Sequence, residues 1–170
     1  MRPADEATPP APPPVSGVRR FLRHAAYMLG ATGLGLAAAS DGIAVAGRHL
    51  GLHLLGSIEI TQGAIVLLGA GGMLYATLEG HHASVHMVTQ RLSPVASARL
   101  ARVMAGISAL VFLAIAVGSL WLGAEMWSGF EQTELLHIPI RWLRALWEIV
   151  ALAIAALFAR QAVVAHGEQP

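Results

Sequence analysis

The chain contains no cysteine and no lysine among its 170 residues, and only 12% of the residues are charged. Without cysteine it can hold neither a disulfide framework nor a metal site built on thiolates. Charged residues make up about a quarter of a usual soluble domain. Here 55% of the residues are hydrophobic and the mean hydropathy is +0.60. This composition indicates an integral membrane protein.

Four long apolar stretches follow one another along the chain. They cover residues 25–46, 58–78, 103–124 and 143–165. Each is close to the roughly 20 residues that a helix needs to cross a hydrocarbon core about 30 Å thick. Because backbone groups in lipid must bond within their own segment, each stretch is predicted to be an α-helix. The expected fold is an all-α integral membrane protein whose four transmembrane helices form one domain over residues 18–166.

The two ends of the chain differ from this domain. Residues 1–17 contain six of the nine prolines together with Asp5 and Glu6, so a disordered, proline-rich tail is expected there. Residues 167–170 form a short C-terminal tail. A cleaved signal peptide is the alternative for the start of the chain. The acidic beginning does not fit a positive n-region, and the first apolar run is too long for an h-region.

The arginines predict the orientation of the helices. If the amino terminus is cytoplasmic, eight of the eleven arginines face the cytoplasm. Since positive residues accumulate on that side, both termini are expected in the cytoplasm. The cytoplasmic set is Arg2, Arg19, Arg20, Arg23, Arg91, Arg99, Arg102 and Arg160, and the opposite set is Arg48, Arg141 and Arg144. Tryptophans are expected at the opposite interface, around the third connection. They are Trp121, Trp127, Trp142 and Trp147.

The connections and a few residues inside the spans carry further expectations. Residues 48–58 and 87–102 mix apolar with basic or polar positions, a pattern typical of short helices lying in the membrane interface. Pro139 allows a helix to begin only shortly before Arg141. Asp41 and Glu148 fit either an interfacial position or a buried contact with a partner group.

Small residues recur at a spacing of four in the first and last spans, on faces that suit either helix packing or a partner. Alanine and glycine are frequent enough in this chain for chance to produce such spacing as well. The faces are Ala31, Gly35 and Ala39, and Ala151, Ala155 and Ala159.

Eight histidines raise the possibility of a metal or haem site, and His81, His82 and His86 are close together in the sequence. Haem between membrane helices needs histidines inside the spans, whereas all eight lie at span ends or in connections. There is no HExxH pattern, nucleophile elbow, P-loop or dinucleotide fingerprint. We therefore expect no catalytic, metal or cofactor site in this chain, and no nucleic-acid partner.

Three short motifs resemble those of the small membrane subunit, DctQ-like, of tripartite ATP-independent periplasmic (TRAP) transporters. The resemblance extends from about Arg19 to Ala165. The motifs are Arg48 with Glu59 at the head of the second span; Gly80-His81-His82-Ala83-Ser84-Val85, with Arg91-Leu92-Ser93-Pro94 after it; and Ile138-Pro139-Ile140-Arg141-Trp142 before the last span. This chain departs from the family at His86, where an acid is usual, and at Asp41, where Asn is common.

The resemblance implies four helices with cytoplasmic termini in the bacterial inner membrane, and a scaffolding role without enzymatic activity. In such a transporter, a periplasmic substrate-binding protein delivers an organic acid anion to a large membrane subunit, and a sodium gradient drives uptake. Sodium ions are expected in the large subunit. The residues expected to hold the fold or the subunit interface are Arg48, Glu59, Gly80, His82, Pro139 and Trp142.

Two other classes remain open at this point. The chain could be a haem-binding or other membrane anchor subunit of an oxidoreductase, which would require axial histidines within the spans. It could also be a stand-alone four-helix channel or regulator, which would require polar residues along a continuous pore.

Overall fold

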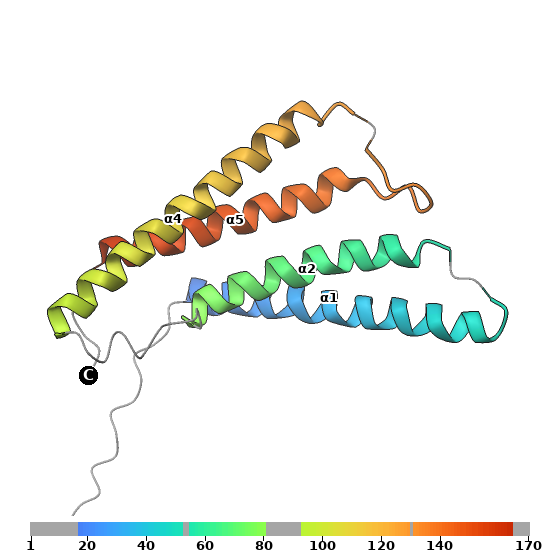
Figure 1. The fold of residues 1–170 in the computed structure, drawn as a ribbon, viewed down its shortest axis with the longest axis horizontal. Coiled ribbons are helices and arrows are strands. Elements are labelled where there is room, and N and C mark those ends of the chain that lie inside the picture. Colours follow the sequence, from blue (N-terminus) through green and yellow to red (C-terminus); the bar gives the residue numbers. More distant parts are fainter. Residues whose placement is uncertain (1–16, 53–54, 81–92, 130, 165–170) are drawn as a thin grey trace, which may run out of the picture.

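The computed structural model describes residues 17–52, 55–80, 93–129 and 131–164 (Figure 1). Its elements are four long helices, each long and apolar enough to cross a membrane. They are α1 (Gly17–His49), α2 (Ser57–Glu79), α4 (Pro94–Glu125) and α5 (Ile140–Val163). The prediction of an all-helical chain with four long apolar helices is confirmed. The expected tails at residues 1–17 and 167–170 lie outside the described residues, apart from Gly17.

The helices stand side by side in one layer, in the order α1, α2, α5, α4 (Figure 1). α1 and α2 pack against each other as one helical hairpin, and α4 and α5 pack as a second. The hairpins meet where α2 lies against α5. The outer helices α1 and α4 therefore each pack mainly against one other helix, and much of their surface is left uncovered.

The core lies between the hairpins, towards the ends of α2 and α5. Ile154 of α5 is fully buried there, and Phe158 stacks on Phe112 of α4 with the ring centroids 5.9 Å apart. The buried members of this cluster are Ala26, Ala70, Leu74, Leu78, Ala105, Val150, Ile154 and Phe158. Alanine, leucine and β-branched side chains dominate the set, so the hairpins are joined here by apolar packing.

Glycine allows the backbones of α1 and α2 to approach closely. A Cβ atom on Gly33 would lie 2.5 Å from the backbone nitrogen of Leu68 and 2.6 Å from the carbonyl oxygen of Ala64. A Cβ atom on Gly71 would overlap the backbone nitrogen of Gly30. Neither position has room for a side chain. Close contact of this kind replaces the hydrophobic driving force that lipid does not supply.

The small-residue face expected on the first span is not the face that packs against α2. Ala31, Gly35 and Ala39 are exposed, and a Cβ atom on Gly35 would meet nothing within 4 Å. The face that packs is formed by the residues around Gly33. On α5 the same kind of spacing agrees better with burial, because Ala151 and Ala155 are buried although Ala159 is exposed.

The described parts of the first two connections contain no separate interfacial helix. Residues 50–52 form a turn in which the Leu52 N–H donates to the Gly47 carbonyl oxygen at 2.8 Å. Residues 94–102 belong to α4, so the prediction of a surface helix over 87–102 is wrong for that part. The reason is local. The Ser93 side chain caps the helix by accepting from the Ala96 N–H at 3.3 Å, and Pro94 needs no hydrogen-bond partner at the first helical position.

We predict that Gly33→Ala destabilises the chain, whereas Gly35→Ala does not. Both substitutions gain the helix propensity of alanine over glycine, but only the first places a methyl group against the backbone of α2. Overpacking of this kind costs about 1–3 kcal/mol. Thermal unfolding of the two purified variants in detergent measures the difference. Equal unfolding temperatures would contradict the close approach of α1 and α2.

Candidate functional site

The α4–α5 loop, residues 126–139, folds back on itself before α5 begins. Gln132 and Pro139 form an isolated antiparallel bridge, and the Thr133 N–H donates to the Ile138 carbonyl oxygen at 3.1 Å. The Ile138 N–H in turn donates to the Thr133 hydroxyl oxygen at 3.0 Å. The Ile140 N–H donates to the Glu131 carbonyl oxygen at 3.2 Å. These bonds give the described part of the loop a defined shape.

Glu59, in the first turn of α2, binds this loop. Its carboxylate accepts hydrogen bonds from the backbone N–H of Leu135 at 2.7 Å and of Leu136 at 2.8 Å. The Leu136 side chain also lies against Gly56, where a Cβ atom would be 2.8 Å from the leucine Cγ. Bonds from backbone N–H groups to a carboxylate are stronger than neutral ones. Glu59 therefore joins the α1–α2 hairpin to the loop that precedes α5.

Arg144 ties the same loop to α5. Its guanidinium donates to the Glu131 carboxylate at 3.1 Å, in an ion pair whose two side chains are only 20% and 30% exposed. The aliphatic part of Arg144 lies against Gly123 of α4, where a Cβ atom would be 3.2 Å from the arginine Cδ. The loop is thus held from two sides, by Glu59 on α2 and by Arg144 on α5.

Pro139 and Trp142 lie at the start of α5. Pro139 is the residue before the helix, with an extended backbone, which confirms the predicted helix start. Trp142 is 62% exposed, and the guanidinium carbon of Arg141 lies 5.7 Å from its ring centroid. Trp121 and Trp127 are also exposed near this end, whereas Trp147 is partly buried against the core. Three of the four tryptophans are therefore exposed near the α4–α5 loop, and their position at a membrane interface stays a prediction.

Arg48 is not brought to Glu59. It is exposed near the end of α1, and its Nε donates to the Ala44 carbonyl oxygen of its own helix at 3.3 Å. The nearness of Arg48 and Glu59 in the sequence therefore does not produce an ion pair between them.

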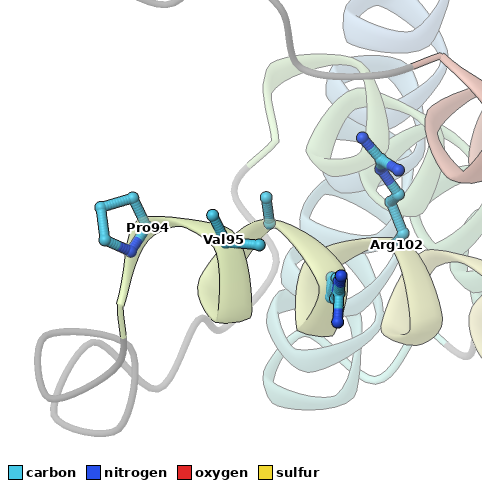
Figure 2. A pocket seen from close by; sticks show the side chains of 5 residues that line it. Pro94, Val95 and Arg102 are labelled. Carbon is cyan, nitrogen blue, oxygen red and sulfur yellow. The ribbon is translucent and has the colours of Figure 1, made fainter.

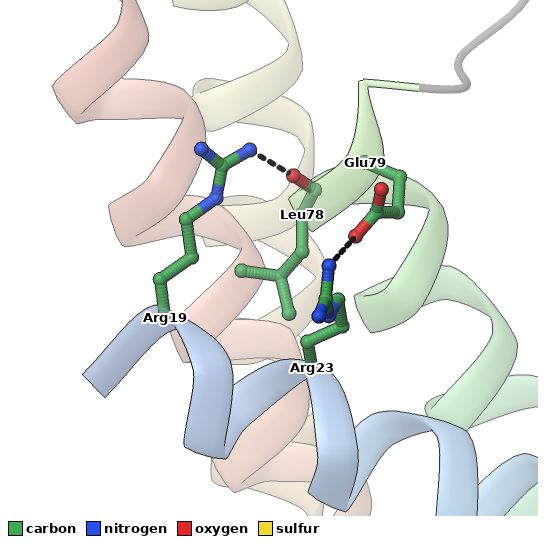
Figure 3. Close-up of polar contacts among 4 residues, drawn as sticks. All are labelled: Arg19, Arg23, Leu78 and Glu79. Atoms are coloured by element: carbon green, nitrogen blue, oxygen red, sulfur yellow. Dashed lines mark hydrogen bonds and ion pairs between the residues drawn. The ribbon is translucent and has the colours of Figure 1, made fainter. Parts of the chain in front are cut away.

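Gly80 ends α2 at the other end of the helices, away from the α4–α5 loop. Its φ of 70° is a left-handed conformation that favours glycine, and its N–H donates to the Ala76 carbonyl oxygen. Beside it, Arg19 donates to the Leu78 carbonyl oxygen at 2.6 Å, and Arg23 forms an ion pair with Glu79 at 3.6 Å (Figure 3). These two arginines bind the start of α1 to the end of α2. His82, the remaining sequence-based candidate, lies outside the described residues.

The two acidic residues left open by the sequence have different surroundings. Asp41 is exposed and accepts a hydrogen bond from the Thr61 hydroxyl at 3.1 Å, close to the start of α2. Glu148 is 7% exposed, and within the described residues neither of its carboxylate oxygens has a hydrogen-bond partner. Asp41 thus fits the interfacial alternative, whereas Glu148 is a buried acid that lacks its expected contact.

Among the described residues, no group of three His, Asp or Glu side chains is arranged to hold a metal ion. A shallow hollow lies at the start of α4 (Figure 2). It is open, and all of its lining residues come from that one helix, so it does not enclose a ligand. They are Pro94, Val95, Ala98, Arg99 and Arg102.

Sequence reasoning missed the two ion pairs seen in the described part of the chain, Arg144 with Glu131 and Arg23 with Glu79. A signal was present for the second pair. Consecutive membrane helices run antiparallel, so the start of α1 and the end of α2 share one end of the layer, and opposite charges there can meet. The partner of Arg144 depends on the fold of the α4–α5 loop, which has no such simple pattern.

We predict that Glu59→Gln loosens the α4–α5 loop. The amide keeps one oxygen acceptor but loses the charge and the second acceptor, so the N–H groups of Leu135 and Leu136 become less protected. Their hydrogen exchange should accelerate about tenfold or more, measured by mass spectrometry on the detergent-solubilised chain. Glu125→Gln, an exposed glutamate at the end of α4, is the matched control. Unchanged protection in Glu59→Gln would rule out the anchoring role.

A comparison with protein families agrees with this architecture. The family model described as "Tripartite ATP-independent periplasmic transporters, DctQ component" matches residues 42–166. That range contains α2, α4, α5 and the end of α1, and so includes Glu59 and the α4–α5 loop. Searches of curated proteins and of solved structures give no match. With most of its length matched, this multi-pass membrane protein belongs to the DctQ family of TRAP transporter components and is not an enzyme.

Proposed function

We propose that this chain is the small permease subunit that scaffolds the large membrane subunit of a TRAP transporter in the bacterial cytoplasmic membrane. The observation that carries the proposal is the single layer of helices. Of the described residues of α4, only Ala105 and Ala116 are buried. Its remaining surface is rich in exposed apolar side chains, including Ile107, Leu110, Val111, Leu113, Ile115 and Val117. A layer of this kind has two broad faces, so one can bind another membrane protein while the other faces lipid.

Transport itself then belongs to the partner chains. The large subunit would move an organic acid anion inward in symport with sodium, after a periplasmic binding protein has delivered it. This chain would bind neither sodium nor substrate, and would stabilise the large subunit and widen its footprint in the bilayer. Family membership favours this role over an oxidoreductase anchor, and no contact in the described residues supports a haem site.

Five of the six sequence-based candidates divide between two roles in this proposal, and the sixth, His82, lies outside the described residues. Glu59, Gly80 and Pro139 would hold the fold of this chain, because each takes part in a helix end or in the α4–α5 loop. Arg48 and Trp142 are exposed, and they would face lipid headgroups or a partner subunit.

Orientation follows from the charges at the two ends of the layer. Arg19, Arg20 and Arg23 at the start of α1 lie at the same end as Arg99 and Arg102 of α4 and Arg160 of α5. The other end has Arg48, Arg141 and Arg144. The positive-inside rule therefore favours a cytoplasmic position for both termini. Exposed Arg99 and Arg102 beside the hollow of Figure 2 suit an anionic membrane surface.

The scaffolding proposal predicts that a tagged copy, extracted from its native membranes in mild detergent, co-purifies with one large polytopic membrane protein in fixed ratio. Mass spectrometry identifies that protein, and an absorbance spectrum of the sample should contain no haem band. Deletion of this chain should lower the amount of the large subunit in the membrane and abolish uptake. A fully active transporter without this chain would overturn the proposal.

The orientation proposal predicts opposite labelling of two single cysteines. Since the chain has no cysteine of its own, Val95→Cys and Gln132→Cys each introduce a unique thiol at an exposed position. A membrane-impermeant maleimide added to spheroplasts should label the cysteine at position 132 and not the one at position 95. Inverted vesicles should give the reverse, and labelling of position 95 from outside would contradict the orientation.

A further inference from the structure

Glu148 is a buried acid without a partner in an apolar environment. It lies eight residues after Ile140, about 12 Å along α5, and therefore well inside a candidate membrane span. Its side chain is almost fully covered, and no described group donates to either oxygen. An uncompensated charge in such a position is strongly destabilising. A cationic group that can reach this carboxylate would compensate its charge.

The nearest cationic side chain on the same face of the helix is Arg144, one turn earlier. Two contacts show that this face is turned towards α4: Arg144 lies against Gly123, and Phe158 stacks on Phe112. Positions 144, 148, 151, 155 and 158 form one stripe along α5 at the spacing of helix neighbours. Glu148 thus lies in the stripe between these two contacts.

The direction of helical side chains places the Glu148 carboxylate on the side of Arg144. Long side chains on an α-helix lean towards its N-terminus. The Glu148 carboxylate therefore extends over the turn that contains Arg144. The Arg144 guanidinium leans the same way and binds Glu131 in the loop. Arg141, the other arginine at the start of α5, lies over the ring of Trp142 instead.

We propose that Arg144 serves two carboxylates in turn, Glu131 in the α4–α5 loop and Glu148 inside the α4–α5 hairpin. When Arg144 binds Glu131, this ion pair holds the loop against α5. When the guanidinium turns inward to Glu148, the buried acid is paired and Glu131 is released. The glycine at position 123 makes room for the arginine side chain against α4, since a Cβ atom there would lie only 3.2 Å from its Cδ. The exchange concerns this chain alone, so it is independent of the proposed scaffolding role.

A spin label at position 132 tests the exchange directly. Gln132→Cys carries the label in the full-length chain, reconstituted in lipid nanodiscs, and electron paramagnetic resonance reports its mobility. In the otherwise unchanged chain we expect two components, one immobile and one mobile. Glu148→Gln should leave only the immobile component, because Arg144 then stays on Glu131. Glu131→Gln and Arg144→Gln should leave only the mobile one.

Glu134→Gln is the matched control. Glu134 is an exposed glutamate of the same loop that forms no ion pair among the described residues, so its substitution should leave both components as they were. A single component in the starting chain, or a spectrum that Glu148→Gln does not change, would overturn the proposal.

A double-mutant cycle gives a second, independent test. Thermal unfolding is measured for Glu131→Gln, Glu148→Gln and the double variant in the same nanodiscs. If both acids use Arg144, only the double variant leaves the arginine unpaired. The decrease in its unfolding temperature should then exceed the sum of the two single decreases by about 2 °C or more. Additive shifts would mean that the two acids do not share a partner, and would overturn the proposal.

Discussion

The fold depends first on the close approach of α1 and α2. Apolar side chains gain little from leaving lipid for one another, so membrane helices are held by packing at short range. At Gly33 and Gly71 there is no side chain to keep the backbones apart, and a Cβ atom at either position would collide with the backbone of the opposite helix. This contact fixes the rotation of α2. That rotation directs one side of α2 towards α5 and determines where the Glu59 carboxylate lies.

The two hairpins are then joined in different ways at their two ends. Towards the ends of α2 and α5, side chains such as Leu74 and Ile154 form an apolar core. Near the start of these helices the connection is polar, because Glu59 accepts from backbone N–H groups of the α4–α5 loop. Hydrogen bonds suit a helix end that lies near water, because water can bond to any polar group that lacks a protein partner. The contact between the hairpins is therefore apolar at one end of the helices and hydrogen-bonded at the other.

The sequence predicted those features that depend on local chemistry. Four helices follow from apolar length, and the start of α5 follows from Pro139, because proline restricts the backbone of its own position. The packing face of α1 could not be predicted, since Gly33 and Gly35 have the same intrinsic properties and differ only in what lies opposite. The partners of Glu59 are 76 and 77 residues away. Family resemblance indicated this residue, but its role required the fold of the loop.

A single layer also limits where a polar side chain can be buried. The outer helices have few buried residues, so the interior of this chain consists mainly of the contact surfaces between neighbouring helices. Glu148 shares its stripe with the α5 residues that contact α4, and it is almost fully covered within this chain. Any group that compensates its charge must therefore come from this chain or enter with water. Arg144 occupies the adjacent turn of the same stripe and forms its ion pair with Glu131 in the loop. The arrangement connects an acid inside the membrane to the loop at its surface through one arginine side chain.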